Sequence, residues 1–193
     1  QTPLSLAVGG SFDSIVAKLL NTGKVDVDWK DVHGRTPLSY AAERGNGVLV
    51  KMLLDRGLAE VDPKDMLHRT PLLWAAARGF KPTFKMLLDT GRVNVESRDE
   101  QGRTPLSLAA GNGNTLIVVK HLLLVGKADP DPSDSEYNAT PLSWAAEDGH
   151  LALAKLLIDT GKVDINSKDV NNRTPLFLAA SNGHGDIVKL LLE

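Results

Sequence analysis

The sequence contains no cysteine and few aromatic residues, and each shortage excludes certain chemical sites or types of hydrophobic core. Without cysteine there are no disulfides, thiol nucleophiles or thiolate metal sites, and the chain fits a reducing compartment. Aromatic residues make up only 5% of the sequence. This composition favours thin helical layers packed through Leu, Val and Ala over a thick aromatic core.

An excess of charge of one sign is also missing, because the formal net charge is −2 over 193 residues. A nucleic-acid-binding protein needs surplus Lys and Arg to neutralise phosphates, and a membrane-surface protein needs a cationic amphipathic segment. No apolar run approaches the roughly 20 residues of a membrane-spanning helix, and no secretion signal is visible. The sequence therefore predicts an intracellular, cytoplasmic protein that binds neither nucleic acid nor membranes.

What the sequence does contain is one triplet, Thr-Pro-Leu, in six copies. The copies begin at Thr2, Thr36, Thr70, Thr104, Thr140 and Thr174, at spacings of 34, 34, 34, 36 and 34 residues. A fixed period of this length indicates a solenoid, in which each unit buries its apolar face against its neighbours. Because the period runs along the whole sequence, we expect one elongated domain over residues 1–193.

The second copy shows why one unit should fold as a helical hairpin. The Thr36 hydroxyl can cap a helix, and Pro37 then occupies the first helical position, where an N–H is not needed. Gly45 supplies the positive φ that ends this helix, and a second apolar helix follows and stops at Gly57. Alternating segments such as Val25-Asp26-Val27-Asp28 predict extended arms that lead into a projecting turn.

These features together resemble the ankyrin repeat, two helices with a protruding β-hairpin. The phrase Gly-Arg-Thr-Pro-Leu-Ser-Tyr-Ala-Ala at residues 34–42 carries the resemblance, which covers the whole chain. It implies an all-α ankyrin-repeat solenoid of six helix-turn-helix units with projecting β-hairpin loops. The longer arm at residues 23–27 also resembles repeats in long arrays of fungal multidomain receptors. Since both ends of the chain cut through a unit, we expect a fragment of a longer array.

The sequence departs from the family pattern at two places. Ankyrin repeats usually carry His directly after Thr-Pro-Leu, but four units here carry Ser, so the hydrogen bonds of that His must be rebuilt or absent. The fourth unit has one extra residue near residues 113–115 and another in its loop, which we expect to be irregular. Asp129, Asp131 and Asp134 in that loop lack the glycine of a calcium loop, and we interpret them as solvated acidic side chains.

A search for catalytic and ligand-binding motifs finds none. The sequence contains no phosphate loop, no H-E-x-x-H and no G-x-S-x-G. His33 and His68 are expected on neighbouring loop tips, where they could share a metal ion, but surface histidines without a role are far commoner. The sequence therefore predicts a protein that is not an enzyme, with no cofactor and no metal.

Positions that differ between units are free to make contacts, whereas repeating positions hold the layers together. The resemblance assigns the variable loop tips and the ends of the first helices to a concave binding face. With layers about 10 Å apart, this face suits a protein segment better than a metabolite, which usually occupies a closed cavity. The predicted partner-binding face comprises Trp29, His33, Arg35, Arg44, Met66, Leu67, Arg69, Arg78, Gln101, Arg103, Asn112, Tyr137, Glu147, Asp148, Asn171 and Arg173.

Two interpretations of the basic residues on this face stay open. In the first, loop arginines such as Arg35 pair with loop aspartates in surface ion pairs worth about 0 to 1 kcal/mol each. In the second, Arg44 and Arg78, flanked by Met66 and Leu67, receive an acidic segment with apolar anchors.

The aromatic residues Tyr40, Trp74 and Trp144 share one unit position, where Leu stands in the other copies. This alternation predicts packing between layers rather than a ligand site. The leading function is a non-catalytic protein-binding module, monomeric within a longer chain. The alternatives are a structural spacer whose tips bind nothing specific, and a regulatory segment attached to a NACHT-like or enzyme domain.

Overall fold

The computed structural model describes residues 2–55, 59–112 and 116–193, and twelve helices lie within them. The chain divides into two compact units, Gln1–Asp99 and Glu100–Glu193. The stop expected at Gly57 and the extra residue expected near residues 113–115 lie outside the described residues.

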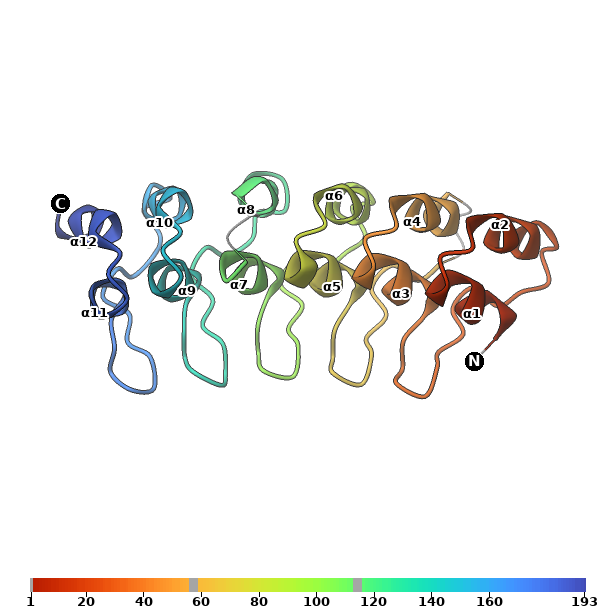
Figure 1. Ribbon diagram of the computed structural model, residues 1–193, viewed down its shortest axis with the longest axis horizontal. Coiled ribbons are helices and arrows are strands. Elements are labelled where there is room, and N and C mark those ends of the chain that lie inside the picture. Colours follow the sequence, from red (N-terminus) through yellow and green to blue (C-terminus); the bar gives the residue numbers. More distant parts are fainter. Residues whose placement is uncertain (1, 56–58, 113–115) are drawn as a thin grey trace. The chain divides into compact units, whose positions relative to one another are not determined.

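In the first unit, three helix pairs stack in two layers (Figure 1). The first helices of the pairs, α1, α3 and α5, pack side by side, and the second helices, α2, α4 and α6, form the other layer. Their bounds are α1 Pro3–Gly9, α2 Asp13–Asn21, α3 Pro37–Glu43, α4 Gly47–Leu54, α5 Pro71–Arg78 and α6 Lys81–Asp89.

The second unit repeats this arrangement with α7, α9 and α11 in one layer and α8, α10 and α12 in the other. Their bounds are α7 Pro105–Ala110, α8 Leu116–Leu124, α9 Pro141–Glu147, α10 Leu151–Ile158, α11 Pro175–Ser181 and α12 Gly185–Leu192. The predicted six helix-turn-helix units are confirmed by these pairs.

Each first helix begins at the Thr-Pro step that the sequence predicts. The Thr36 hydroxyl accepts the backbone N–H of Ser39 at 3.3 Å, and Pro37 occupies the first helical position. The serine in place of the family histidine closes a small network with the capping threonine. Ser107 Oγ accepts the Thr104 N–H at 2.8 Å and donates to the Thr104 carbonyl at 3.0 Å. The hydrogen bonds are therefore rebuilt within a single turn.

The core of each unit consists of small and branched apolar residues between the layers. The Leu of the triplet is at most 1% exposed in the first five repeats, and Ala41 and Ala42 are fully buried. Two alanines at this point let neighbouring helices approach closely, which is what a stack of thin layers requires.

The loops project from the first-helix layer of each unit (Figure 1), and each tip is a hairpin turn. In the first loop, the Asp31 N–H donates to the Arg35 carbonyl at 3.0 Å. The alternating segments differ from the expected extended arms, because Val27 and Asp28 form a turn in which Asp26 Oδ1 accepts the Asp28 N–H at 2.9 Å. The short aspartate side chain competes with an extended ladder by bonding its own backbone.

Carboxylates in these segments also connect consecutive loops. The Asp28 carboxylate accepts the Glu60 N–H at 3.0 Å, and Asp62 Oδ2 accepts the Asn94 N–H at 3.0 Å. Burial raises the pKa of both carboxyl groups, although the backbone bond counteracts it. These side chains are thus part of the packing between repeats, which the alternation alone did not predict.

The acidic loop before α9 is a correction to the sequence interpretation. Asp134 is 3% exposed, and its two oxygens accept the Tyr137 N–H at 2.7 Å and the Trp144 Nε1–H at 3.2 Å. Asp131 is half-buried and accepts the Asp164 N–H at 2.9 Å. The interpretation of Asp131 and Asp134 as solvated side chains was wrong, since both are removed from solvent and accept backbone or indole N–H groups, whereas Asp129 is exposed as expected.

Candidate functional site

The loop face of each unit is the surface formed by its loop tips and first helices. In the first unit, neighbouring tips are joined by the Met66 N–H, which donates to the His33 carbonyl at 2.9 Å. Met66 and Leu67 are 67% and 45% exposed, and Trp29 is 46% exposed. The first unit therefore presents apolar side chains at its tips, although apolar residues are usually buried.

A hollow of about 410 Å³ lies between two of these tips. His33, Arg35, Met66, Leu67 and Trp74 line it together with Asp65. A second hollow of about 310 Å³ includes Leu6, Tyr40 and Arg44 in its lining. The structure thus places Met66 and Leu67 around the first hollow, whereas Arg44 belongs to the second.

The guanidinium of Arg35 is held by three side chains of its own repeat. Its Cζ lies 4.2 Å from the centroid of the Tyr40 ring, and its Nη2 donates to the Tyr40 hydroxyl at 2.7 Å. Its Nη1 donates to Glu43 Oε2 at 3.1 Å, and its Nε lies 3.8 Å from Asp31 Oδ2. We call Asp31, Tyr40 and Glu43 the arginine seat of the second repeat.

Hydrogen bonding within this seat sets the ionisation of its members. Burial by itself would raise the pKa of Asp31, but bonds from the Tyr40 hydroxyl and from the Arg35 and His33 N–H groups lower it overall. Burial raises the pKa of Tyr40, and its hydrogen bond to Asp31 raises it further. The seat is therefore a fixed arrangement of a carboxylate and a neutral phenol.

The third repeat holds its arginine in a related way. The Arg69 Cζ lies 4.6 Å from the Trp74 ring centroid, and Trp74 Nε1 donates to Asp65 Oδ2 at 2.9 Å. The Arg69 Nε lies 3.4 Å from Asp99 Oδ2 of the following loop. Trp74 is 7% exposed beneath this arginine, so its packing role is confirmed.

The ion pairs predicted along the loops are confirmed at Arg35, Arg69 and Arg173. Arg35 pairs with Asp31, Arg69 with Asp99, and Arg173 Nε lies 2.6 Å from Asp169 Oδ2. Burial alone would raise the pKa of Asp169, but hydrogen bonds from Arg173 and from the Asn171 N–H lower it. The second interpretation, acidic-segment binding by Arg44 and Arg78, stays a prediction.

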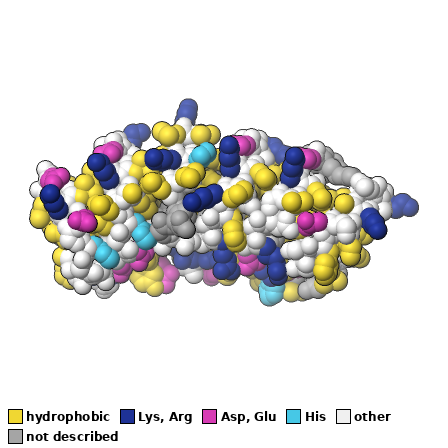
Figure 2. Space-filling view, turned by 45° about the horizontal axis from the view of Figure 1, so that its top comes forward, with side chains coloured by type: hydrophobic (Ala, Val, Ile, Leu, Met, Phe, Trp, Pro, Cys, Tyr) yellow, Lys and Arg dark blue, Asp and Glu magenta, His cyan; other side chains and the backbone are white. Residues whose placement is uncertain are grey.

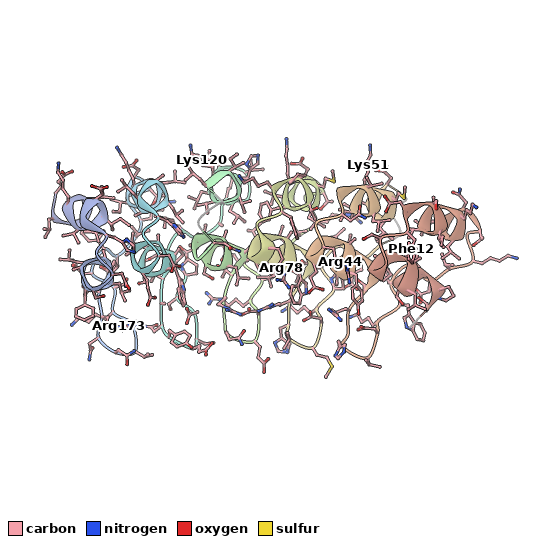
Figure 3. The ribbon with its side chains drawn as sticks, in the orientation of Figure 1. Phe12, Arg44, Lys51, Arg78, Lys120 and Arg173 are labelled. Atoms are coloured by element: carbon pink, nitrogen blue, oxygen red, sulfur yellow. The ribbon has the colours of Figure 1, made fainter. Side chains whose placement is uncertain are left out.

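Arg44 and Arg78 lie at the ends of the first helices, where Figure 3 labels them. Arg78 Nη2 lies 3.3 Å from Glu43 Oε1, and its side chain is 54% exposed. Glu43 therefore contacts both Arg35 and Arg78, and it is 20% exposed. Arg44 is exposed at the C-terminal end of α3.

Exposed charge on the first unit's loop face is mainly positive. The loop aspartates Asp31, Asp65 and Asp99 have largely buried side chains and accept hydrogen bonds or ion pairs from the protein itself. The exposed basic side chains on this face are Lys30, His33, Arg44, Lys64, His68 and Arg78. An acidic partner segment is the chemistry that complements such a surface.

In the second unit the tips are joined by the same kind of backbone bond. The Ser135 N–H donates to the Gln101 carbonyl, and the Val170 N–H donates to the Tyr137 carbonyl, both at 2.9 Å. Arg103 Nη2 donates to Gln101 Oε1 at 2.8 Å. Of the remaining predicted residues, Asn112, Asp148 and Asn171 are exposed, whereas Glu147 and Arg173 are half-buried and lie 4.0 Å apart.

The sequence interpretation missed how the aromatic position is used. Tyr40, Trp74 and Trp144 each donate to a loop aspartate, so they fix the loop on the first helix. The signal is present in the sequence, because an aspartate precedes each aromatic by nine or ten residues and an arginine precedes Tyr40 and Trp74 by five.

In each unit the side opposite the loops is formed by the second helices. Lys51 of the first unit and Lys120 of the second extend away from the loops of their own units (Figure 3), and Figure 2 shows apolar, basic and acidic side chains interspersed over the second helices. Among the described residues, no helix has the length and apolar character needed to cross a membrane. No group of three or more His, Asp or Glu side chains in the described chain is arranged to hold a metal ion.

The chain belongs to the ankyrin repeat family. A family model described as ankyrin repeats (3 copies) matches residues 1–65, 49–133 and 108–193. Among solved structures, the ankyrin repeat domain of Bcl-3, titled a unique member of the IkappaB protein family, is similar at 27% identity and a TM-score of 0.83. The match covers 100% of this chain and 85% of that one.

A second solved structure, the ankyrin repeat protein EF0377, is 27% identical with a TM-score of 0.88. The match covers 99% of this chain and 96% of that one. No curated protein matches the chain. Ankyrin repeats are in general protein-interaction modules, and their fold is in general a non-catalytic scaffold.

Proposed function

We propose that the chain is a non-catalytic module that binds a segment of a partner protein along its loop faces. The observation that carries this proposal is the first unit's hollow of about 410 Å³, where exposed Met66 and Leu67 lie beside the Arg35 guanidinium. Apolar anchors beside a positioned cation are typical of the central residues of protein interfaces.

The proposal includes the wider organisation expected from the sequence. Residues 1–193 act as one monomeric, cytoplasmic ankyrin domain, and a protein segment rather than nucleic acid or a membrane is the ligand. The net charge of −2 supports a protein ligand over a polyanion. The partner residues for the first unit are acidic with apolar anchors, because the exposed cations there outnumber exposed carboxylates.

A peptide selection tests this function without knowledge of the partner. Random peptides displayed on phage are selected on the immobilised chain, and enriched peptides are synthesised and titrated by fluorescence anisotropy. We expect enriched peptides that carry Asp or Glu next to apolar residues. Their affinity should fall about tenfold or more in the double variant Met66→Asp/Leu67→Asp, because the anchors are lost and like charges are introduced.

The matched control is Lys51→Glu, which changes charge on the second-helix side of the same unit. It should leave the peptide affinity within a factor of about two. Absence of any enriched peptide would favour the alternative function, a structural spacer whose loop tips bind nothing specific. Equal effects of both variants, or enriched peptides without acidic residues, would contradict binding of an acidic segment at the loop face.

A further inference from the structure

The fifth repeat keeps the arginine seat of the second repeat but lacks the arginine. Aligned on their capping threonines, Thr36 and Thr140, the two repeats match at the aromatic and glutamate positions, and the aspartates match once the extra residue of the longer loop is allowed for. The matching pairs are Asp31 with Asp134, Tyr40 with Trp144 and Glu43 with Glu147, whereas Ala139 stands where the second repeat has Arg35.

The backbone confirms that these positions are equivalent. The Asp31 N–H donates to the Arg35 carbonyl at 3.0 Å, and the Asp134 N–H donates to the Ala139 carbonyl at 3.1 Å. The extra residue of the longer loop is therefore accommodated between Asp134 and Ala139. Ala139 directly precedes the capping Thr140, as Arg35 directly precedes Thr36.

The remaining seat is intact and more open. Asp134 still accepts the Trp144 Nε1–H at 3.2 Å, and the Tyr137 ring meets Trp144 edge-on with centroids 6.1 Å apart. Trp144 is half-buried, whereas Trp74 beneath Arg69 is 7% exposed. Among the described residues of this unit, no Lys or Arg of the chain lies over the Trp144 ring.

The charge around this ring is negative. Glu136 and Asp148 are exposed, and the Glu147 side chain is 33% exposed. Arg173 directs its Nε to Asp169 at 2.6 Å and reaches Glu147 only at 4.0 Å, and Arg103, which acts electrostatically on Tyr137, donates to Gln101 Oε1 at 2.8 Å. The second unit as a whole carries 8 Lys and Arg against 12 Asp and Glu, a net charge of −4, whereas the first carries 14 against 12.

We propose that Trp144 and Glu147 bind an arginine side chain of the partner protein in the place that Arg35 occupies in the second repeat, while the buried Asp134 holds the Trp144 indole in position. This proposal deepens the proposed function, because it names the chemistry that the second unit recognises. A guanidinium can stack its plane on an aromatic face while its N–H groups bond a carboxylate in that plane, which an ammonium group cannot do. The partner segment for this unit is therefore basic, with one arginine as its central contact.

The three tryptophans of the chain make this proposal measurable by NMR. Each gives one indole N–H signal, and the probe is N-acetyl-arginine methylamide titrated into the ¹⁵N-labelled full chain. We expect the Trp144 signal to shift with saturation. The Trp74 signal should stay in place because Arg69 already covers that ring, and Trp29 serves as an exposed reference.

Two further probes test the chemistry of the ligand. N-acetyl-citrulline methylamide has nearly the shape of the arginine probe but no charge, and it should produce no saturable shift. N-acetyl-lysine methylamide should bind about threefold or more weakly, since its ammonium cannot stack as a plane. A citrulline response equal to the arginine response would overturn the proposal.

Variants of the seat provide the second test. Ala139→Arg restores the pattern of the second repeat, so the chain's own guanidinium should occupy the seat and weaken probe binding about tenfold or more. Ala152→Arg adds the same charge on an exposed second-helix position and should leave binding unchanged. Glu147→Gln, which keeps the shape of the side chain, should weaken binding even if Ala139→Arg does not fold.

These outcomes are separable from those of the peptide selection. A full Trp144 response in both Ala139→Arg and Glu147→Gln would refute the seat, while acidic peptides could still bind the first unit. Conversely, loss of all peptide enrichment together with a specific Trp144 response would refute the acidic-segment function and leave the arginine site standing.

Discussion

Removal of the Asp31 carboxylate should destabilise the chain far more than its loop position suggests. Its Oδ1 accepts the N–H groups of His33 at 2.9 Å and Arg35 at 2.8 Å, and its Oδ2 accepts the Tyr40 hydroxyl at 2.7 Å. The side chain is only 2% exposed. In the variant Asp31→Ala, all three donors lose their acceptor at once, and Arg35 loses one of its carboxylates.

The size of the effect follows from those three bonds. A hydrogen bond to a charged group contributes about 1.5–3 kcal/mol, so full loss would reach several kcal/mol. Water reaches the exposed His33 N–H and part of the Tyr40 hydroxyl, and it replaces some of what is lost. We therefore expect Asp31→Ala to lower the free energy of unfolding by about 3 kcal/mol. Asp31→Asn keeps the Oδ1 acceptor and should lower it by about 1 kcal/mol.

Urea denaturation at neutral pH measures both variants, with the slope on denaturant as a check that the transition is unchanged. The control is Asp26→Ala, whose exposed carboxylate accepts one N–H, from Asp28, and should cost about 0.5 kcal/mol. A loss below about 0.5 kcal/mol for Asp31→Ala would refute the account of the seat.

The pH dependence gives an independent check. Because folding lowers the pKa of Asp31 below the ordinary aspartate value of 3.8, the carboxylate contributes its stability fully above that value. This contribution is lost as the pH falls through the lowered folded-state pKa. The stability of Asp31→Asn should therefore decline less than that of the unchanged chain below pH 3.8.

Three other predictions test the packing. Gly102→Ala should lower the free energy of unfolding by well over 1 kcal/mol, because φ is +74° and a Cβ would lie 2.8 Å from the Ser135 backbone N. Gly161→Ala, at φ +65° with nothing within 4 Å of the added Cβ, should lower it by only about 1 kcal/mol, and thermal unfolding compares the two variants. Burial raises the pKa of Asp62, so the folded chain favours the protonated carboxyl group and loses stability as the pH rises above 3.8. Asp62→Asn should reduce this loss, and urea denaturation across the acid pH range measures it. Leu142→Ala should lower the free energy of unfolding by about 2–5 kcal/mol, because this side chain is fully buried.

The fold was predictable because its signals are local and repeated. A capping threonine, a proline at the first helical position and paired alanines recur with one period, so even weak propensities agree at each copy. The details of the loops were not predictable from alternation. Val-Asp-Val-Asp satisfies the pattern of a strand, but the carboxylate of Asp26 captures the Asp28 N–H, and this competition depends on side-chain geometry.

The exposure of the loop tips was predictable from the sequence, but the chemistry of the candidate site was not. Variable residues at the loop tips, such as Met66 and Tyr137, are exposed as expected. The sequence could not show which arginines are paired within the chain and which are available to a ligand, because Arg35 and Arg44 differ only in the partners that the fold brings to them. Whether such a cation is available to a ligand depends on the carboxylates that surround it.

An array of repeats allows a site to be recognised by the residue that one copy omits. In the second repeat, a buried aspartate, an aromatic ring and a helix-end glutamate surround Arg35. The fifth repeat keeps those groups and replaces the arginine with Ala139. A scaffold position has no need to keep the helix-end glutamate beside the ring once the cation is absent, because a nearby cation is what favours the charged form of a partly buried carboxylate. Retention of the glutamate together with Trp144 is explained if the cation comes from outside the chain, and the Ala139→Arg variant decides between these readings because it supplies that cation from within.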